Sequence, residues 1–306
     1  VARRGAALSR RGSGGSGCAL RAAPWDGLFG SGDKVEVPAT SAQALQSLKA
    51  CMEACVKNGH LRVDIDLPLG LRLYPVDGSR PDALRLLEAE PSKERIAEAD
   101  LNLARVLTEM LGPVQSELLV AFRTGKQAKA AREAWAAAGV GGKVFAYDGA
   151  RRPAKRTAFG AGGDDADDAE RFIKAVKDSA CSFVVVVAPR ARQLKAVADL
   201  DTSLTGKTCI ILANARLRVP GARMDATREK LAALFRPAYN LQLVGQPGRE
   251  GIVFHTVREG RTTPWVLAER ALQVSEESGR EEFVAKELGT RFDPPTLADL
   301  RETFGA

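Results

Sequence analysis

The chain has 306 residues, of which 45% are apolar and 27% charged, so it can bury a large core as one or two domains of an ordinary soluble protein. Of its net charge of +7, +4 falls in residues 1–34, which hold six Lys or Arg and two Asp. The remaining residues carry +3 (7 − 4), a near balance that argues against a nucleic-acid binder. No apolar run approaches the roughly 18 residues that span a bilayer, so we expect no transmembrane segment.

The N-terminal segment, residues 1–34, is rich in Arg, Ser and Gly and has no acidic residue before Asp26. This composition is typical of an organelle transit peptide, and a disordered basic tail is the alternative. Trp25, Leu28 and Phe29 are unusual in such a tail, and they could pack on the folded body or on a partner.

Helical and strand patterns alternate after this segment. Apolar residues at helical spacing, with Gly or Pro near the ends, predict helices over 41–57, 92–111 and 125–138. Short apolar runs between and after them predict strands over 61–66, 117–122 and 143–147. Such alternation indicates a mostly parallel sheet with helices on both faces, a Rossmann-like arrangement.

A polar insertion interrupts the alternation. Arg151, Arg152, Lys155 and Arg156 form a basic run, and four acidic residues follow at 164–168, where a helix is predicted to begin. Acidic side chains in a first helical turn favour the positive end of the helix dipole, and a metal site is the alternative interpretation. The basic run is either a solvated loop or a docking patch for an acidic partner or an anionic lipid surface.

The segment SFVVVVAPR, from Ser182 to Arg190, is the most apolar stretch of the chain. Phe183–Val187 is short, uninterrupted and mostly β-branched, which predicts a strand buried on both faces. A helix over 193–200, a strand over 209–213 and a helix over 225–235 continue the alternation.

From Tyr239 onward, apolar and polar residues alternate strictly, which indicates antiparallel strands over 239–244, 251–257 and 264–267. Short helices are predicted around Glu281–Leu288 and Leu297–Phe304. The expected fold is α/β, with a five-stranded, mostly parallel core sheet extended by a C-terminal antiparallel meander. The expected organisation is an N-terminal segment 1–34, an α/β domain 35–275 and a helical tail 276–306.

Motifs that carry chemistry are weak in this sequence. The tetrapeptide Thr205-Gly206-Lys207-Thr208 has the GKT of a phosphate-binding loop, but a strand follows where that loop requires a helix. The tripeptide Thr124-Gly125-Lys126 does lie between a strand and a helix, where backbone amides could meet an anion. His60 and His255 have no partner at recognisable spacing. We therefore expect no catalytic residue, no metal and no cofactor.

The cysteines suggest packing. Cys51 and Cys55 lie one helical turn apart, and this geometry seldom permits a disulfide, so we predict reduced thiols that face the core or its margin. A redox or metal role is the alternative, although no His or further Cys is suitably spaced.

The predicted sheet places a set of polar residues at the carboxyl ends of its parallel strands. Ligands of parallel sheets bind beyond the carboxyl ends of the strands, and polar residues collect there. A mixed-charge rim of this kind could hold a phosphate or a carboxylate, and the alternative is that strand ends are simply polar. The candidate ligand-binding residues are Asp64, Asp66, Arg123, Lys126, Arg190, Asn214 and Arg216.

Several segments carry a family resemblance: LRVDIDLP at 61–68, FVVVVAPR at 183–190, IILANARL at 210–217 and FRPAYNLQLV at 235–244. Their order and spacing resemble a domain of unknown function of chloroplast and cyanobacterial proteins. That family includes the third of the low-photosystem-II-accumulation assembly factors. Members often have Asn-Pro-Arg where this chain has Asn214-Ala215-Arg216, a departure that weakens any claim that this loop is a fixed functional element of the family.

The resemblance implies a chloroplast protein, in the stroma or on the stromal face of the thylakoid, with an auxiliary role in photosynthesis. Our first hypothesis is a non-enzymatic accessory or assembly protein that binds a photosystem or another photosynthetic membrane complex peripherally. Its expected docking residues are Trp25, Leu28, Phe29, Arg151, Arg152, Lys155 and Arg156. The alternative is a binder of, or enzyme acting on, a nucleotide or phosphorylated small molecule at the strand ends.

Overall fold

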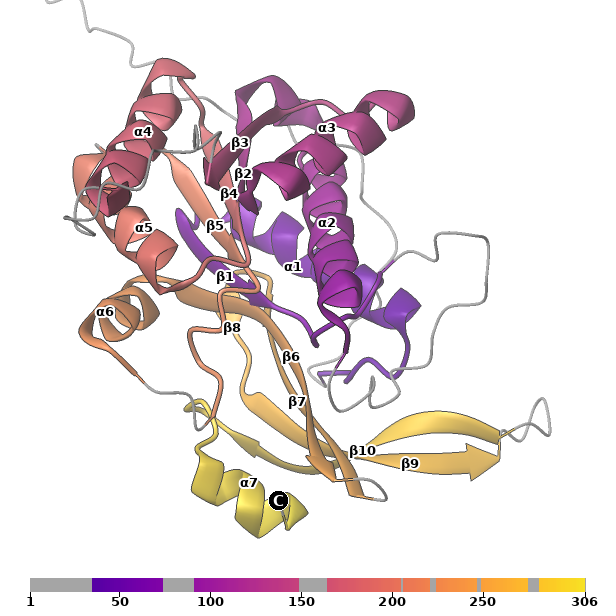
Figure 1. The fold of residues 1–306 in the computed structure, drawn as a ribbon. Helices are drawn as coiled ribbons and strands as arrows, with labels where there is room; N and C mark the ends of the chain where they lie inside the picture. The colour runs from indigo at the N-terminus through magenta and orange to yellow at the C-terminus, as the bar shows by residue number, and fades with distance from the viewer. Residues whose placement is uncertain are drawn as a thin grey trace, which may run out of the picture. The chain divides into compact units, whose positions relative to one another are not determined.

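The structure is a computed structural model that describes residues 35–73, 91–148, 164–204, 206–220, 224–246, 249–274 and 281–305. The strands described there form one sheet in the order β10-β9-β7-β6-β1-β5-β4-β2-β3, with β8 paired to β7 (Figure 1). Parallel pairs connect β3 through to β6, and antiparallel pairs connect β6 through to β10. The predicted α/β fold with an antiparallel extension is therefore confirmed.

The parallel part of the sheet surrounds the apolar strand that the sequence singles out. This strand, β4 (Phe183–Val187), pairs in register with β5 (Cys209–Ala213) on one side and β2 (Leu118–Thr124) on the other. Both β4 and β5 are buried along their whole length, as uninterrupted β-branched runs require in a sheet covered on both faces. The remaining parallel strands are β1 (Arg62–Asp66), β3 (Lys143–Asp148) and β6 (Arg236–Gln246).

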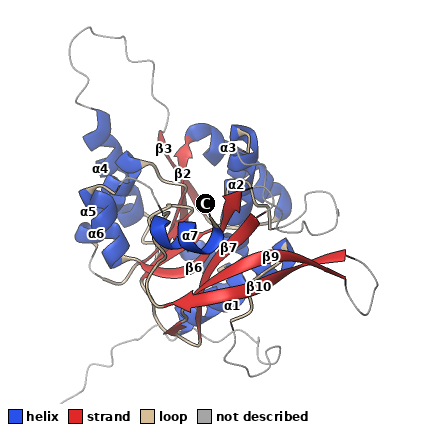
Figure 2. Ribbon diagram, turned by 90° about the horizontal axis from the view of Figure 1, so that it is seen from below, coloured by secondary structure: helices blue, strands red, loops and turns tan. Residues whose placement is uncertain are grey.

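Helices cover both faces of the sheet (Figures 1 and 2). The α1–α3 face carries α1 (Ser41–Lys57), α2 (Lys93–Met110) and α3 (Gly125–Ala138), with a short 3-10 helix at Gly112–Glu117. The α4–α6 face carries α4 (Asp164–Asp178), α5 (Ala191–Ser203) and α6 (Ala226–Leu234). This division follows from right-handed crossovers, because the chain runs outward along the sheet from β1 to β3 and then back to β6.

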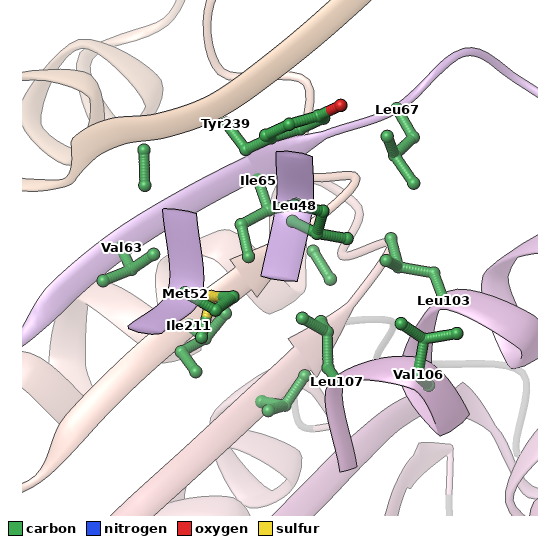
Figure 3. Close-up of a cluster of buried hydrophobic side chains, with 14 of the residues drawn as sticks. Leu48, Met52, Val63, Ile65, Leu67, Leu103, Val106, Leu107, Ile211 and Tyr239 are labelled. Atoms are coloured by element: carbon green, nitrogen blue, oxygen red, sulfur yellow. The ribbon is translucent and has the colours of Figure 1, made fainter. Parts of the chain in front are cut away.

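The core of the α1–α3 face shows why these helices form. Leu48 and Met52 of α1 lie one turn apart and pack toward Val63, Ile65 and Ile211 of the sheet (Figure 3). The helix begins at a capping box, in which the Thr40 hydroxyl accepts from the amide of Gln43 and the Gln43 side chain accepts from the amide of Thr40.

The predicted thiols lie in this same core. Cys51 and Cys55 are buried and free, so their placement agrees with the prediction of reduced, core-facing thiols. The Sγ of Cys51 donates to the carbonyl of Ala238 at 3.0 Å, which ties α1 to β6.

The antiparallel extension consists of β6, β7 (Arg249–Arg258), β8 (Arg261–Thr262), β9 (Trp265–Val274), β10 (Glu281–Arg291) and the helix α7 (Leu297–Phe304). β9 pairs with β7 only from Val266 to Glu269, whereas β10 pairs with β9 from end to end. The outer halves of β9 and β10 therefore project beyond β7 as a two-stranded ribbon (Figure 1).

One predicted element is wrong. Glu281–Leu288 was expected to be helical, and it forms most of β10. Phe283, Val284 and Leu288 recur at helical spacing among helix-forming Glu, Ala and Lys residues, but pairing with β9 overrides this local preference. The pairing of β10 with β9 is interrupted by a bulge between Glu287 and Gly289, and the bulge leaves Leu288 without a register partner in β9.

Candidate functional site

The sheet has a topological switch point at β1 and β5. The connection after β1 leads to α2 on the α1–α3 face, whereas the connection after β5 leads to α6 on the opposite face. Adjacent parallel strands whose connections diverge in this way leave a crevice at their carboxyl ends, where ligands of α/β proteins bind. The predicted residues Asp64 and Asp66 come from β1, and Asn214 and Arg216 follow β5.

Asn214 spans this crevice. Its backbone adopts a left-handed conformation, with φ of 54°, which Asn tolerates better than most residues. Its side-chain oxygen accepts from the amide of Leu67 at 2.9 Å, and its side-chain nitrogen donates to Asp100 of α2 at 2.9 Å. Asn214 therefore joins the ends of β1 and β5 to α2, and the group that could meet a ligand is used within the chain.

Arg216 completes this bridge. It is also left-handed, with φ of 58°, and its amide donates to Asp66 Oδ1 at 3.0 Å. Its guanidinium donates to the carbonyl of Leu67 at 2.6 Å. Burial raises the pKa of Asp66, and the nearby charge of Arg216 opposes that rise.

Asp64 is held by an arginine that the sequence did not single out. Its Oδ2 accepts from Arg218 Nη1 at 2.6 Å, and the other terminal nitrogen of Arg218 donates to the carbonyls of Ala232 and Phe235 at the end of α6. Burial and the neighbouring carboxylate of Asp66 raise the pKa of Asp64, while Arg218 opposes this effect. The signal in the sequence is the pair of acids on one face of a buried strand, because such acids require a cation nearby.

Asp100 is a second residue that sequence reasoning missed. It is buried in α2, and burial raises its pKa while the Asn214 amide and the charges of Arg216 and Arg123 oppose the rise. Arg123 is thus linked electrostatically to the group at the switch point. Lys126 and Arg190 are exposed at the first turn of α3 and at the residue preceding α5.

The structure therefore brings Asp64, Asp66, Asn214 and Arg216 together and leaves Lys126 and Arg190 at the surface. Ligand binding at the strand ends stays a prediction. In the part of the chain that the structure describes, no three or more His, Cys, Asp or Glu side chains are grouped so that they could hold a metal ion. The predicted docking residues in 1–34 and 151–156 lie outside the described residues.

A second candidate surface lies on the antiparallel extension. Large apolar side chains are exposed at Val274 on β9, at Leu288 in the β10 bulge, at Phe292 just after β10 and at Leu297 in α7. Phe292 is 90% exposed, which is unusual for an aromatic side chain of this size. Leu288 and Phe292 lie in and next to β10, the last strand of the described sheet order, and exposed apolar side chains beside such an edge are typical of interaction surfaces.

The described helices include none that is both long and apolar enough to cross a bilayer. A family model described as a domain of unknown function (DUF1995) matches residues 38–299. A comparison with curated proteins gave no significant match.

Proposed function

The chain belongs to the DUF1995 family, and on this premise we propose that it is a non-enzymatic plastid accessory protein that docks peripherally on a photosynthetic membrane complex, with a photosystem as the expected partner. The plastid location rests on the resemblance to chloroplast and cyanobacterial family members, among them a photosystem II assembly factor. The basic segment 1–34, with its transit-like composition, supports the same location.

The observation that carries the docking proposal is the 90% exposure of Phe292, which directly follows β10 at the end opposite the projecting tip of the β9–β10 ribbon. β10 is the last strand of the described sheet order, so the backbone groups on its outer side have no neighbouring strand in that order. Such an edge can accept an extended segment of a partner, and apolar side chains beside it supply the area that drives association.

The contacts at the switch point support a binding role and not a catalytic one. The polar groups at the ends of β1 and β5 hold their own loops together through Asn214, Arg216 and Arg218. A catalytic site needs groups that are free to meet a substrate, and here the geometry stabilises the fold instead.

The test is affinity purification of the tagged protein from plastids, comparing the wild type with a Leu288→Ser, Phe292→Ser variant. We expect the wild type to co-purify subunits of a photosynthetic membrane complex and the variant to retain less than about a tenth of them, since two apolar contacts are lost. The matched control is Leu234→Ser, because Leu234 is 39% exposed on α6 and Leu288 is 43% exposed on β10.

Both variants should melt within a few degrees of the wild type, since exposed side chains contribute little to stability. Equal recovery of the complex by the wild type and the Leu288→Ser, Phe292→Ser variant would refute docking through this surface. Failure of the wild type to recover any photosynthetic complex would refute the proposed partner.

A further inference from the structure

A group of basic side chains lies at the edge of the sheet opposite the switch point, where the amino ends of β1 and β6 are neighbours. Val63 of β1 is in register with Arg236, the first residue of β6. The β7–β8 hairpin turns at this edge, because β7 runs antiparallel to β6 and ends at Arg258. This turn lies against the end of α1, since a β-carbon at Gly260 would be 2.5 Å from the side chain of Asn58. Segments that are far apart in the sequence therefore meet here.

Arg236 joins these segments through hydrogen bonds. One of its terminal nitrogens donates to His60 Nε2 at 2.9 Å, and the other donates to the hydroxyl of Thr262 in β8. A guanidinium cannot accept a hydrogen bond, so the imidazole accepts and is neutral. Burial and the charge of Arg236 both lower the pKa of His60, which favours this neutral form. The charge of Arg236 therefore meets neutral groups in both contacts.

We call Lys57, Arg236, Arg258 and Arg261 the basic rim. Lys57 is the last residue of α1, and Arg258 pairs with Arg261 across the turn of the hairpin. Arg236 is half-buried, and the other three side chains are exposed. Among the residues that the structure describes, no ion pair joins Lys57, Arg236 or Arg261 to an acidic side chain.

The acidic residues near the rim offset only part of its charge. Glu259 lies in the turn and Glu53 lies one helical turn before Lys57, so two acidic residues stand against four basic ones. Asp201, at the same edge, is already paired with Arg62. Exposed cations in excess attract an anionic surface, and salt screens that attraction.

Apolar side chains beside the rim indicate which anionic surface it fits. Leu61, next to His60, is exposed. Arg291 of β10 is in register with Trp265 of β9, which follows β8 closely, so the exposed Phe292 lies at the same end of the extension as the rim. Apolar and aromatic side chains beside Lys and Arg suit a membrane interface, where the cations meet anionic headgroups and the apolar groups enter between them.

We propose that the basic rim binds the anionic surface of a lipid bilayer. The choice of a bilayer over an acidic protein rests on the peripheral membrane docking proposed above. The rim then orients the chain on the membrane, and the β10 edge remains available to the complex.

The experiment sediments the full chain with vesicles of phosphatidylcholine alone or of phosphatidylcholine mixed with phosphatidylglycerol. The wild type should bind the mixed vesicles more tightly, and raised salt should weaken this binding. Each basic residue at an anionic surface tightens binding about fivefold, so Lys57→Ser, Arg261→Ser should bind the mixed vesicles about tenfold more weakly or less tightly still. Lys57→Arg, Arg261→Lys keeps both charges and should bind as the wild type does.

The matched control is Lys174→Ser, Lys195→Ser, which removes two exposed cations from α4 and α5 and gives the same net charge. It should bind within about twofold of the wild type. The basic segment 1–34 is present in every variant, so it cannot produce a difference between them. All substituted side chains are exposed, and the melting temperatures should agree within a few degrees.

Equal binding of the wild type to the two kinds of vesicle overturns the proposal, as does equal binding by Lys57→Ser, Arg261→Ser and the control. Unchanged vesicle binding by Lys57→Ser, Arg261→Ser with loss of the co-purified complex also overturns it, because the rim would then contact a protein. The Leu288→Ser, Phe292→Ser variant keeps the rim and should still prefer the mixed vesicles, so failure of the docking surface and failure of the rim are distinguishable.

Discussion

The parallel and antiparallel halves of the sheet distribute polar and apolar groups in opposite ways. In the parallel half, β4 and β5 are wholly apolar and buried, and polar groups at the strand ends bond to one another. In the antiparallel half, large apolar side chains are exposed, among them Val274, Leu288 and Phe292. This contrast indicates that the parallel half stabilises the fold and the antiparallel half is arranged for contact with other molecules.

The largest expected effect is a difference in unfolding free energy between a Val→Asp substitution in the parallel half and one in the antiparallel half. Val185→Asp places an unpaired charge in the centre of β4 and should cost about 3 kcal/mol or more of unfolding free energy. Val274→Asp, at a position that is 58% exposed on β9, should change it by less than about 0.5 kcal/mol. Urea denaturation measures both, and similar losses in the two variants would contradict the division between the halves.

Sequence patterns predicted the parallel half well because its information is local. The β-branched run Phe183–Val187 and the flanking helices follow from composition and periodicity alone, and the structure confirms them. In the antiparallel half, Glu281–Leu288 was predicted wrongly as a helix, because its strand depends on pairing with β9. Local propensity cannot predict such an edge strand, because its structure is set by a neighbour elsewhere in the chain.

The candidate site could be predicted only in part from the sequence, because some of its residues follow from local patterns and others do not. Asp64, Asp66, Asn214 and Arg216 follow directly from the positions of strand ends, and they do come together. Arg218 lies two residues beyond Arg216, in a loop whose path no sequence pattern determines.

The next largest effect tests the arginine that holds Asp64. Arg218→Met leaves the carboxylate buried without its cation and should destabilise the protein by about 3 kcal/mol at neutral pH. Adding Asp64→Asn should recover part of this loss. Arg105→Met removes the exposed ion pair with Glu109 and should cost less than about 0.5 kcal/mol in the same denaturation assay. A cost for Arg218→Met no larger than that for Arg105→Met would show that the buried pair contributes no more than a surface pair.

A smaller effect should appear on acidification, through His255. Burial lowers the pKa of His255 from 6.5 to about 4, and the charges of Arg218 and Arg236 act in the same direction. The unfolded state therefore binds the proton first, so the contribution of His255 to stability is present above pH 6.5 and is lost as pH falls toward 4. The loss is about 3 kcal/mol at most, from the size of the shift.

The comparison with His255→Phe isolates this contribution. Asp64 and Asp66, whose pKa values are raised by burial, act in the opposite sense, because their contributions are lost as pH rises. Subtracting the pH dependence of the unfolding free energy of His255→Phe from that of the wild type removes the contributions of Asp64 and Asp66. An identical pH dependence in the wild type and His255→Phe between pH 6.5 and 4 would contradict a buried, neutral imidazole.

The most direct test of the contrast between the halves is hydrogen exchange of the protein with and without solubilised thylakoid complexes. We expect slower exchange in β10 from Leu288 to Arg291 and around Phe292, with no change at the ends of β1 and β5. Protection of residues 66–70 and 214–218, with residues 288–292 unchanged, would contradict this expectation and would place the contact surface at the switch point instead.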